Sequence, residues 1–425
     1  MRDFREALDR VLNLRRKFEA LLASARRKAP RAPAQPGGRP SRLRELTGFG
    51  PNPGNLRMFA YTPERLSPMA PLVVALHGCT QTAEEYDNGT GWSSLADNLG
   101  VAIIYPQQQP TKNPKSCFSW FLTDDITRGN GEAFSIRRMI EHAIALFGSD
   151  RRKVFVTGLS AGGAMASVML ATYPEIFAGG AIIAGLPYGC ASNVQQAFEA
   201  MFTEQDRPAK TLGDRVRAAS SYQGPWPKVS IWHGTDDPIV KPSNGEDIIR
   251  QWINVHGISE PPFEQLIGPH SRRIWNDASG NALIEAFSIS GMGHGVPLAT
   301  TASRDGYGMP GAFFLNVGIS STDHIARFWG LNEWSLEAGL AADAVVAPVQ
   351  ASTEGRAFVL SGAHSEQSLD GEEKRDSTAF DPNDVIARAF KAAGLPIPKM
   401  PPDAAARTAP GPIIAAAFKA AGLLR

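Results

Sequence analysis

Short runs of apolar residues alternate with segments of helical periodicity over about residues 46–337. The runs are four to seven residues long and lie at 71–76, 101–105, 154–157, 178–184 and 229–232. Continuous apolar strands joined by helices are typical of a parallel sheet that helices cover on both faces. Residues 274–289 differ, because Asp277–Asn281 has the composition of a hairpin turn. The predicted fold class is therefore α/β, with a mostly parallel central sheet.

Residues 1–45 precede this domain and have a different pattern. Apolar side chains recur at helical spacing over residues 3–28, with charged residues elsewhere, and residues 29–40 are rich in Pro and Gly. We predict an amphipathic helix followed by a linker. The helix either packs on the main domain or, through its basic face, lies on an anionic membrane or polymer surface.

Residues 338–425 form a low-complexity tail of Ala, Pro, Ser and acidic residues, for which we expect mostly disorder. The segment 385–395 recurs at 413–423, with an Ile and a Phe one helical turn apart in each copy. Helices this short are unstable alone in water. We therefore expect each copy to dock, either on the main domain or on a partner protein or an apolar granule surface.

Composition excludes several classes of protein. Lys and Arg number 43 against 42 Asp and Glu, a net charge of +1, so no overall field favours nucleic acid. No stretch approaches the roughly 18–20 apolar residues of a membrane span, and the charged N-terminus lacks the apolar core of a secretory signal. Three cysteines leave at least one thiol free, which fits a reducing compartment. We expect a cytoplasmic protein.

The motif Gly158-Leu-Ser160-Ala-Gly162 follows an apolar strand and opens a helix. This context is typical of a nucleophile elbow, in which glycines permit a sharp, strained turn and the serine hydroxyl projects from the sheet. The first N–H groups of the helix point toward the same place. Ser160 is therefore the candidate nucleophile.

A serine hydroxyl needs a base and an orienting carboxylate, which follow it in the chain in this arrangement. The apolar strand 229–232 leads into a turn with two acids, Asp236 and Asp237, and both fit. We prefer Asp237 because Pro238 fixes the turn beyond it, in which case Asp236 caps that turn.

The candidate base is His294, which lies among glycines after the predicted strand near residue 289. Those glycines would let the imidazole reach Ser160. His77 and His233 directly follow strands and precede glycines, so we expect them to bond to local backbone groups instead.

The loop after strand 71–76 is positioned to supply an oxyanion-hole donor. We assign the two backbone N–H donors to Cys79 and to Ala161, the residue after the nucleophile. The Cys79 thiol need not be reactive in this role. No Cys or His pair has metal-ligand spacing and no phosphate-binding loop follows a strand, so we predict neither metal nor cofactor.

With these residues placed, the chain resembles the poly(3-hydroxybutyrate) depolymerase-type esterases of the α/β-hydrolase fold. The resemblance covers about residues 46–335 and depends on LHGCTQTAEEYDNGTGWSSLAD, CFSWF at 117–121, VFVTGLSAGGAMASVMLATYPEIFAGGAIIAGLPYGCA and HGTDDPIV. It implies ester hydrolysis by Ser160, Asp237 and His294, and an apolar cleft with a tryptophan near the serine. Trp120 is the best match for that substrate contact, with a place in the core as its alternative.

The resemblance further implies 3-hydroxyalkanoate polymer or oligomers as substrate. The absence of a recognisable signal makes the chain similar to the intracellular kind, which meets amorphous granules or soluble oligomers. Feruloyl or acetyl esters are the alternative substrates, because related esterases share the core. A non-catalytic granule-associated scaffold that works through its terminal helices is the alternative of another class.

Overall fold

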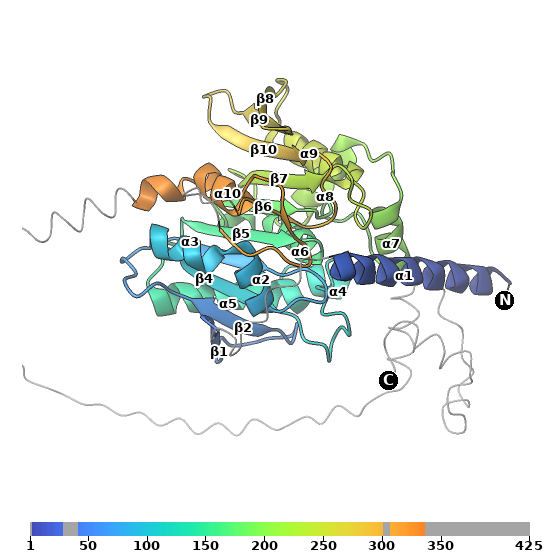
Figure 1. Ribbon diagram of the computed structural model, residues 1–425, viewed down its shortest axis with the longest axis horizontal. Helices are drawn as coiled ribbons and strands as arrows, with labels where there is room; N and C mark the ends of the chain where they lie inside the picture. Colours follow the sequence, from blue (N-terminus) through green and yellow to red (C-terminus); the bar gives the residue numbers. More distant parts are fainter. Residues whose placement is uncertain (1, 29–40, 301–306, 336–425) are drawn as a thin grey trace, which may run out of the picture.

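A ten-stranded sheet organises the described part of the chain, which in this computed structural model comprises residues 2–28, 41–300 and 307–335 (Figure 1). Its strand order is β1-β2-β4-β3-β5-β6-β7-β10-β9-β8. The predicted linker at 29–40 and the predicted short helices at 385–395 and 413–423 lie outside the described residues.

The sheet is parallel at its centre and antiparallel at its edges. The neighbours from β4 through β3, β5, β6 and β7 to β10 pair in parallel, whereas β1, β2, β9 and β8 run antiparallel to their neighbours. Every residue of β3, β4, β5 and β6 is buried, which explains the continuous apolar runs. The strands are β1 (Arg44–Leu46), β2 (Arg57–Tyr61), β3 (Leu72–Leu76), β4 (Ala102–Gln107), β5 (Val154–Leu159), β6 (Gly179–Ile183), β7 (Lys228–Gly234), β8 (Phe263–Ile267), β9 (His270–Asn276), β10 (Ala282–Ile289) and a separate pair, β11 (Val296–Leu298) and β12 (Phe314–Asn316).

Helices cover both faces of the sheet. Neighbouring residues of a strand point to opposite faces, and in β6 a Cβ at Gly180 would touch Leu170 of α6, whereas one at Gly179 would approach Trp329 of α10. Helices α6 and α10 therefore lie on opposite faces. The helices are α1 (Arg2–Lys28), α2 (Ala83–Thr90), α3 (Trp92–Leu99), α4 (Thr123–Ile126), α5 (Gly131–Phe147), α6 (Ala161–Thr172), α7 (Val194–Phe202), α8 (Ala209–Ala218), α9 (Ser243–His256) and α10 (Ser321–Trp329), with a 3-10 turn at Pro174–Ile176.

The predicted fold class is confirmed. The predicted apolar strands correspond to β3, β4, β5, β6 and β7, and the hairpin around Asp277–Asn281 corresponds to β9 and β10. Helices α2, α3, α7 and α8 and strand β8 were not among the predicted elements.

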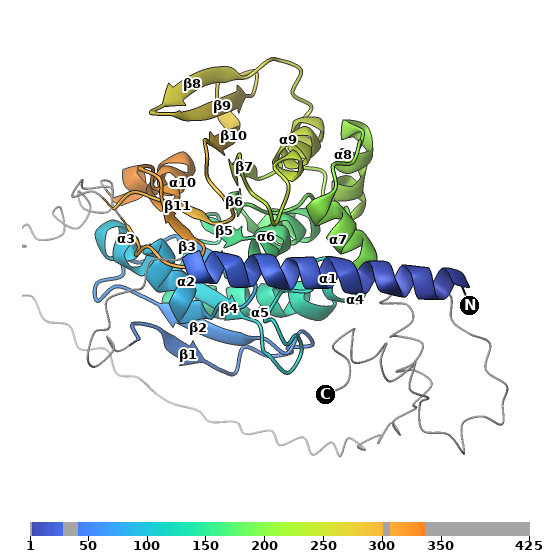
Figure 2. The same ribbon diagram turned by 45° about the vertical axis from the view of Figure 1, so that its right-hand side comes forward.

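Helix α1 docks on the domain with its C-terminal part, while its N-terminal part extends beyond the body (Figures 1 and 2). Phe18 and Leu22 are 8% and 7% exposed, and Leu14, Leu21 and Ala25 pack beside them. Burial of two large apolar side chains contributes roughly 3–6 kcal/mol. The structure thus agrees with packing on the main domain, and binding to an outside surface stays a prediction.

Candidate active site

Four loops meet at one edge of the sheet. Strands β3, β5, β7 and β10 belong to its parallel part, so their C-terminal ends lie on the same edge. The loops that follow these strands carry Cys79, Ser160, Asp237 and His294 in turn. The topology thus brings together residues that are far apart in the sequence.

Ser160 links β5 to α6 in a strained backbone conformation, with φ 58° and ψ −118°. Residues with a side chain rarely adopt it. Glycines on both sides of Ser160 allow the backbone segments to pack closely. A Cβ at Gly158 would lie 2.4 Å from the Gly162 carbonyl carbon, and one at Gly162 would lie 2.2 Å from the Leu76 carbonyl oxygen. The predicted sharp turn is therefore present, and close backbone packing requires both glycines.

Asp237, not Asp236, faces His294. Its Oδ2 accepts a hydrogen bond from Nδ1 of His294 at 2.6 Å, and its Oδ1 accepts from the N–H groups of Ile239 at 2.8 Å and Val240 at 3.0 Å. Asp237 is 3% exposed. Asp236 is exposed, and its carboxylate accepts from the Thr235 hydroxyl at 3.0 Å.

The environment of Asp237 favours its ionised form. Burial alone would raise the pKa of this carboxyl, but the positive potential and hydrogen bonds of His294 and His233 hold the pKa below its ordinary value. An ionised Asp237 keeps the proton of the His294 ring on Nδ1. The other ring nitrogen, Nε2, is then the one available as a base.

His233 is a neighbour of the carboxylate that the sequence analysis assigns to the local backbone. Its Nε2 lies 2.9 Å from the Val240 carbonyl oxygen, as expected, and also 3.4 Å from Oδ2 of Asp237. His233 and Asp237 are four residues apart on either side of a tight turn, and this spacing could have indicated the second contact.

Ser160 and His294 line one small cavity, together with Gly78, Cys79, Gln81, Leu159, Phe313 and Leu22. Both side chains are almost covered, at 6% exposed each. Within the described residues, no hydrogen bond joins Ser160 to His294. Catalytic hydrogen bonds are often longer in the unliganded state and tighten when substrate binds.

The oxyanion-hole residues predicted from sequence flank the same cavity. Cys79 lines it directly, and Ala161 is the first residue of α6, where N–H groups have no partner within the helix. The Cys79 loop is held in shape because the Gly78 N–H donates to Oε1 of Gln81 at 2.7 Å and the Thr80 N–H donates to the Lys115 carbonyl at 2.5 Å.

His77 supports that loop through backbone contacts on both ring nitrogens, as predicted. The Gln108 N–H donates to Nε2 at 3.1 Å, so Nδ1 carries the proton and donates to the Gly78 carbonyl at 2.8 Å. Burial lowers the pKa of His77 to about 4. A neutral imidazole with one fixed tautomer thus lies beneath the Cys79 loop.

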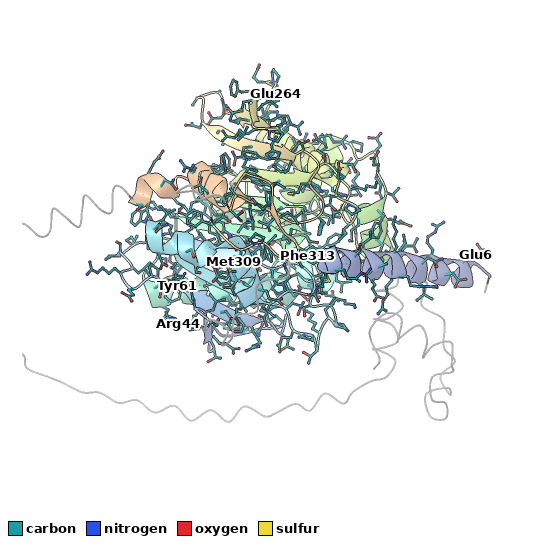
Figure 3. The ribbon with its side chains drawn as sticks, viewed as in Figure 1. Glu6, Arg44, Tyr61, Glu264, Met309 and Phe313 are labelled. Carbon is teal, nitrogen blue, oxygen red and sulfur yellow. A yellow bond between two sulfur atoms is a disulfide. The ribbon has the colours of Figure 1, made fainter. Side chains whose placement is uncertain are left out.

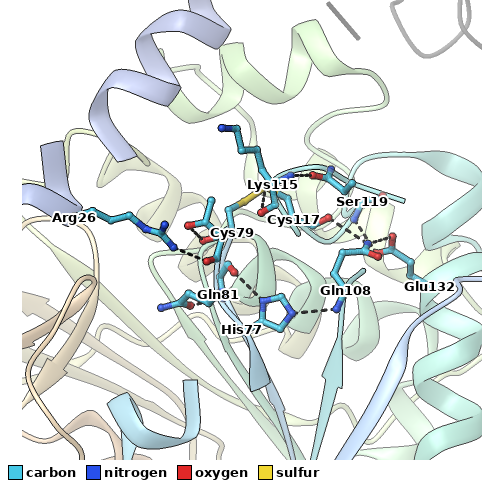
Figure 4. The surroundings of a disulfide bond; sticks show 12 residues. Arg26, His77, Cys79, Gln81, Gln108, Lys115, Cys117, Ser119 and Glu132 are labelled. Carbon is cyan, nitrogen blue, oxygen red and sulfur yellow. Dashed lines mark hydrogen bonds between the residues drawn. A yellow bond between two sulfur atoms is a disulfide. The ribbon is translucent and has the colours of Figure 1, made fainter. Parts of the chain in front are cut away.

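Cys79 forms a disulfide with Cys117, a pairing that the sequence left open (Figure 4). The bond ties the loop after β3 to the loop after β4. Cys190 is the free cysteine among the described residues, which agrees with the prediction of at least one unpaired thiol. Pairing depends on the adjacency of β3 and β4, which cysteine spacing along the chain does not reveal.

Trp120 is not among the residues that line the cavity. It is 7% exposed and packs edge-on against Phe121, with ring centroids 5.1 Å apart. Its loop is held by Glu132, whose carboxylate accepts from the Ser119 N–H at 2.8 Å. Burial raises the pKa of Glu132 to about 7. The structure agrees with the core alternative for Trp120, and its contact with substrate stays a prediction.

Helix α1 covers this site, which the sequence analysis did not foresee. Leu22 lines the cavity beside Phe313, and the Arg26 guanidinium donates to the Thr80 carbonyl at 2.6 Å (Figure 4). Figure 3 shows Phe313 at the C-terminal end of α1, with Glu6 at the far end. An amphipathic pattern predicts that one face of a helix is buried, but the pattern does not say against what.

The described residues contain no cluster of three or more His, Cys, Asp or Glu suited to a metal ion. None of their helices combines the length and apolar character that crossing a bilayer demands.

Comparisons with known proteins agree with this geometry. Residues 59–264 match the family model described as Esterase PHB depolymerase. The chain is 44% identical over 291 residues to poly(3-hydroxyalkanoate) depolymerase C of Paucimonas lemoignei, covering 68% of this chain and 70% of the relative. It is 37% identical over 278 residues to an acetylxylan esterase of Coprinopsis cinerea, covering 64% and 73%.

Other similar proteins are a feruloyl esterase and an acetyl xylan esterase by name. Feruloyl esterase B of Talaromyces stipitatus is 31% identical over 279 residues, covering 63% of this chain and 76% of the relative. Among solved structures, the acetyl xylan esterase from Aspergillus awamori superimposes with a TM-score of 0.58 at 28% identity, covering 68% of this chain and 99% of that one.

Proposed function

The chain belongs to the PHB depolymerase family of esterases, and from this premise we propose that it is a serine hydrolase of poly(3-hydroxybutyrate) or 3-hydroxybutyrate oligomers. The relatives make it a carboxylic ester hydrolase with the α/β-hydrolase fold. The serine mechanism and the polyester substrate are the proposed part. The observation that carries the serine mechanism is the Asp237–His294 hydrogen bond at 2.6 Å, beside a strained Ser160 in one cavity. The polyester substrate is supported by the similarity to poly(3-hydroxyalkanoate) depolymerase C.

In the first half of the reaction, Ser160 Oγ attacks the ester carbonyl carbon while Nε2 of His294 takes the hydroxyl proton. The carbonyl oxygen becomes an oxyanion that accepts hydrogen bonds from the backbone N–H groups of Cys79 and Ala161. Each such donor contributes about 3 kcal/mol to transition-state stabilisation. The C–O bond to the leaving alcohol breaks, and His294 returns the proton to that alcohol.

In the second half, water attacks the acyl-enzyme. His294 takes a proton from the water, the tetrahedral intermediate forms over the same two donors, and the C–Oγ bond breaks. Ser160 recovers its proton from His294, and the carboxylic acid leaves. Throughout both halves, Asp237 holds the Nδ1 proton and stabilises the imidazolium.

Active-site labelling tests the serine mechanism. A fluorophosphonate probe is expected to label one serine in the wild type and none in Ser160→Ala. Ser167→Ala is the matched control, because Ser167 is a buried serine of α6 whose hydroxyl donates to the Leu186 carbonyl at 2.9 Å. Persistent labelling in Ser160→Ala would remove Ser160 from the mechanism.

Substrate class is tested by parallel rates on amorphous poly(3-hydroxybutyrate), its dimer, p-nitrophenyl acetate and methyl ferulate. The proposal expects the polymer or the dimer to be hydrolysed faster than the ferulate. The second candidate, a feruloyl or acetyl esterase, is favoured by the acetylxylan and feruloyl esterase relatives. A methyl ferulate rate above the dimer rate would favour that candidate.

We further propose a cytoplasmic location at polyester granules, reached through the terminal helices. Two sequence features support the association with granules: the amphipathic pattern over residues 3–28 and the repeated tail segment. The Cys79–Cys117 disulfide weakens the basis of this location, because disulfides are rare in cytosolic proteins. Fluorescence microscopy of the full chain in granule-forming cells tests it.

A further inference from the structure

The catalytic cavity is too small for any ester. Its volume is about 10 Å³, which is close to the space of one water molecule. Cavities that hold small organic ligands measure roughly 300–1,000 Å³. A substrate therefore enters the site only after one of the lining groups has moved.

Leu22 is the lining residue that comes from outside the esterase domain. The other seven belong to the domain that starts after residue 40, whereas Leu22 belongs to α1. The family match begins at residue 59, so α1 also lies outside the matched residues. The helix thus adds a cover to a site that the rest of the domain already forms.

Apolar contacts, together with the hydrogen bond from Arg26 to the Thr80 carbonyl at 2.6 Å, hold α1 in place. Phe18 packs against Phe198 of α7 with ring centroids 5.9 Å apart. Two ion pairs between α1 and the domain, Lys115–Glu19 at 3.9 Å and Arg10–Glu199 at 3.7 Å, are long and partly exposed. Exposed pairs of this kind contribute little to stability. Undocking therefore exposes apolar side chains to water, unless another apolar surface receives them.

We propose that α1 is a lid that closes the active site in water and opens onto the surface of an apolar polyester. On that surface, the stripe of Leu14, Phe18, Leu21, Leu22 and Ala25 leaves the domain and binds the polymer. The inference rests on the proposed function, because it takes solid 3-hydroxyalkanoate polyester as the surface. The outer face of α1 carries exposed Arg16 and Arg27, which stay in water in both positions. Arg26 gives up its hydrogen bond to the Thr80 carbonyl when the helix undocks.

The closed state is tested by the rate at which a fluorophosphonate labels Ser160 in the full chain. Leu22→Asp places a charge in the cavity and favours the open state, so labelling is expected to be at least about tenfold faster, in proportion to the open fraction. Ala23→Asp is the matched control, because it adds the same charge one residue away on the exposed face. It should label at the wild-type rate.

A second variant, Phe18→Ala, weakens docking without touching the cavity and should speed labelling about threefold or more. If Leu22→Asp shows no cooperative thermal unfolding and is therefore not folded, the labelling rate of Phe18→Ala tests the lid instead. Wild-type rates in both variants would overturn the lid, as would equal acceleration by Ala23→Asp. Absence of labelling in every folded variant would contradict both the lid and the serine mechanism.

Surface binding is measured separately by adsorption to amorphous poly(3-hydroxybutyrate) particles, with Ser160→Ala in every chain so that the particles persist. Phe18→Asp should lower the affinity at least about tenfold relative to Ala23→Asp, because it removes a large apolar contact. Equal adsorption of the two chains would overturn opening onto polyester. A third result is possible, in which Phe18→Asp weakens adsorption but the wild-type protein does not hydrolyse the polymer. That result would contradict the proposed substrate and still support the lid.

Discussion

The two oxygens of Asp237 have different tasks. Oδ1 accepts two backbone N–H groups, whereas Oδ2 holds His294 and lies 3.4 Å from His233. The backbone contacts fix the carboxylate, so that Oδ2 meets the imidazole in one orientation. Replacement by an amide would retain the shape but present a donor to Nδ1, which favours the wrong tautomer.

Asp237→Asn is therefore expected to lower kcat about 10⁴-fold with little change in stability. Asp236→Asn is the control and should alter kcat by less than about twofold, because its side chain is exposed and does not reach His294. Steady-state hydrolysis of p-nitrophenyl acetate gives both values. A larger loss in Asp236→Asn would reverse the assignment of the acid.

His256 makes folding sensitive to pH, since burial lowers its pKa to about 4. The unfolded histidine has a pKa of about 6.5, so below that pH the unfolded chain binds a proton that the folded chain excludes. The free energy of unfolding should fall as pH drops from about 6.5 toward 4. In His256→Gln this fall should be smaller by roughly 1–2 kcal/mol at pH 5.

Urea unfolding of wild type and His256→Gln at pH 5, 7 and 8 provides the measurement. Between pH 7 and 8 the difference in free energy of unfolding between the two proteins should stay nearly constant. His256 is mostly neutral there in the folded and in the unfolded chain. If the free energy of unfolding fell equally between pH 7 and pH 5 in wild type and in His256→Gln, the prediction would be contradicted.

At the scale of single residues, sequence patterns predict the site well where a turn fixes the side chain. Asp237 was preferred for the turn at Pro238, and it is the acid that contacts His294. The bond of Cys79 to Cys117 was missed, because it depends on two loops that meet only in the fold.

At the scale of elements, prediction succeeds where burial is complete. Strands β3, β4, β5 and β6 are buried at every residue and read as apolar runs. Helix α7 has 9 residues, fewer than the window of about 11–18 residues over which helical periodicity is recognised. Helix α1 was predicted with nearly its observed bounds, but its place over Ser160 was not.

The junction of β5 and α6 leaves no room for a side chain at Gly162. Gly162→Ala is expected to lower the free energy of unfolding by about 3 kcal/mol or more, because the new Cβ would lie 2.2 Å from the Leu76 carbonyl oxygen. Gly293→Ala is the control, since no heavy atom lies within 4 Å of its Cβ position. It should change stability by less than about 0.5 kcal/mol in urea unfolding. Equal stability of the two variants would show that the junction relaxes.

On the scale of the whole molecule, the esterase domain and the tail should be separable. Deletion of residues 338–425 is expected to leave the rate of hydrolysis of the soluble 3-hydroxybutyrate dimer within about twofold of the wild-type rate. Binding to amorphous granules should weaken about tenfold or more, because one of several binding segments on the same chain is lost. Sedimentation with granules and dimer assays provide the two readouts. Loss of dimer hydrolysis in a chain that still unfolds cooperatively would assign the tail a role in the domain itself.

The disulfide between Cys79 and Cys117 has a practical consequence for anyone who prepares this enzyme. It encloses α2, α3 and β4 in a covalent ring and tethers the backbone amide expected to receive the oxyanion. Protein produced in a strongly reducing host would carry that amide on an untethered segment. Recombinant batches should therefore be compared by thiol titration before their specific activities are compared, since the oxidation state of one cysteine pair could otherwise pass for a difference in catalytic quality.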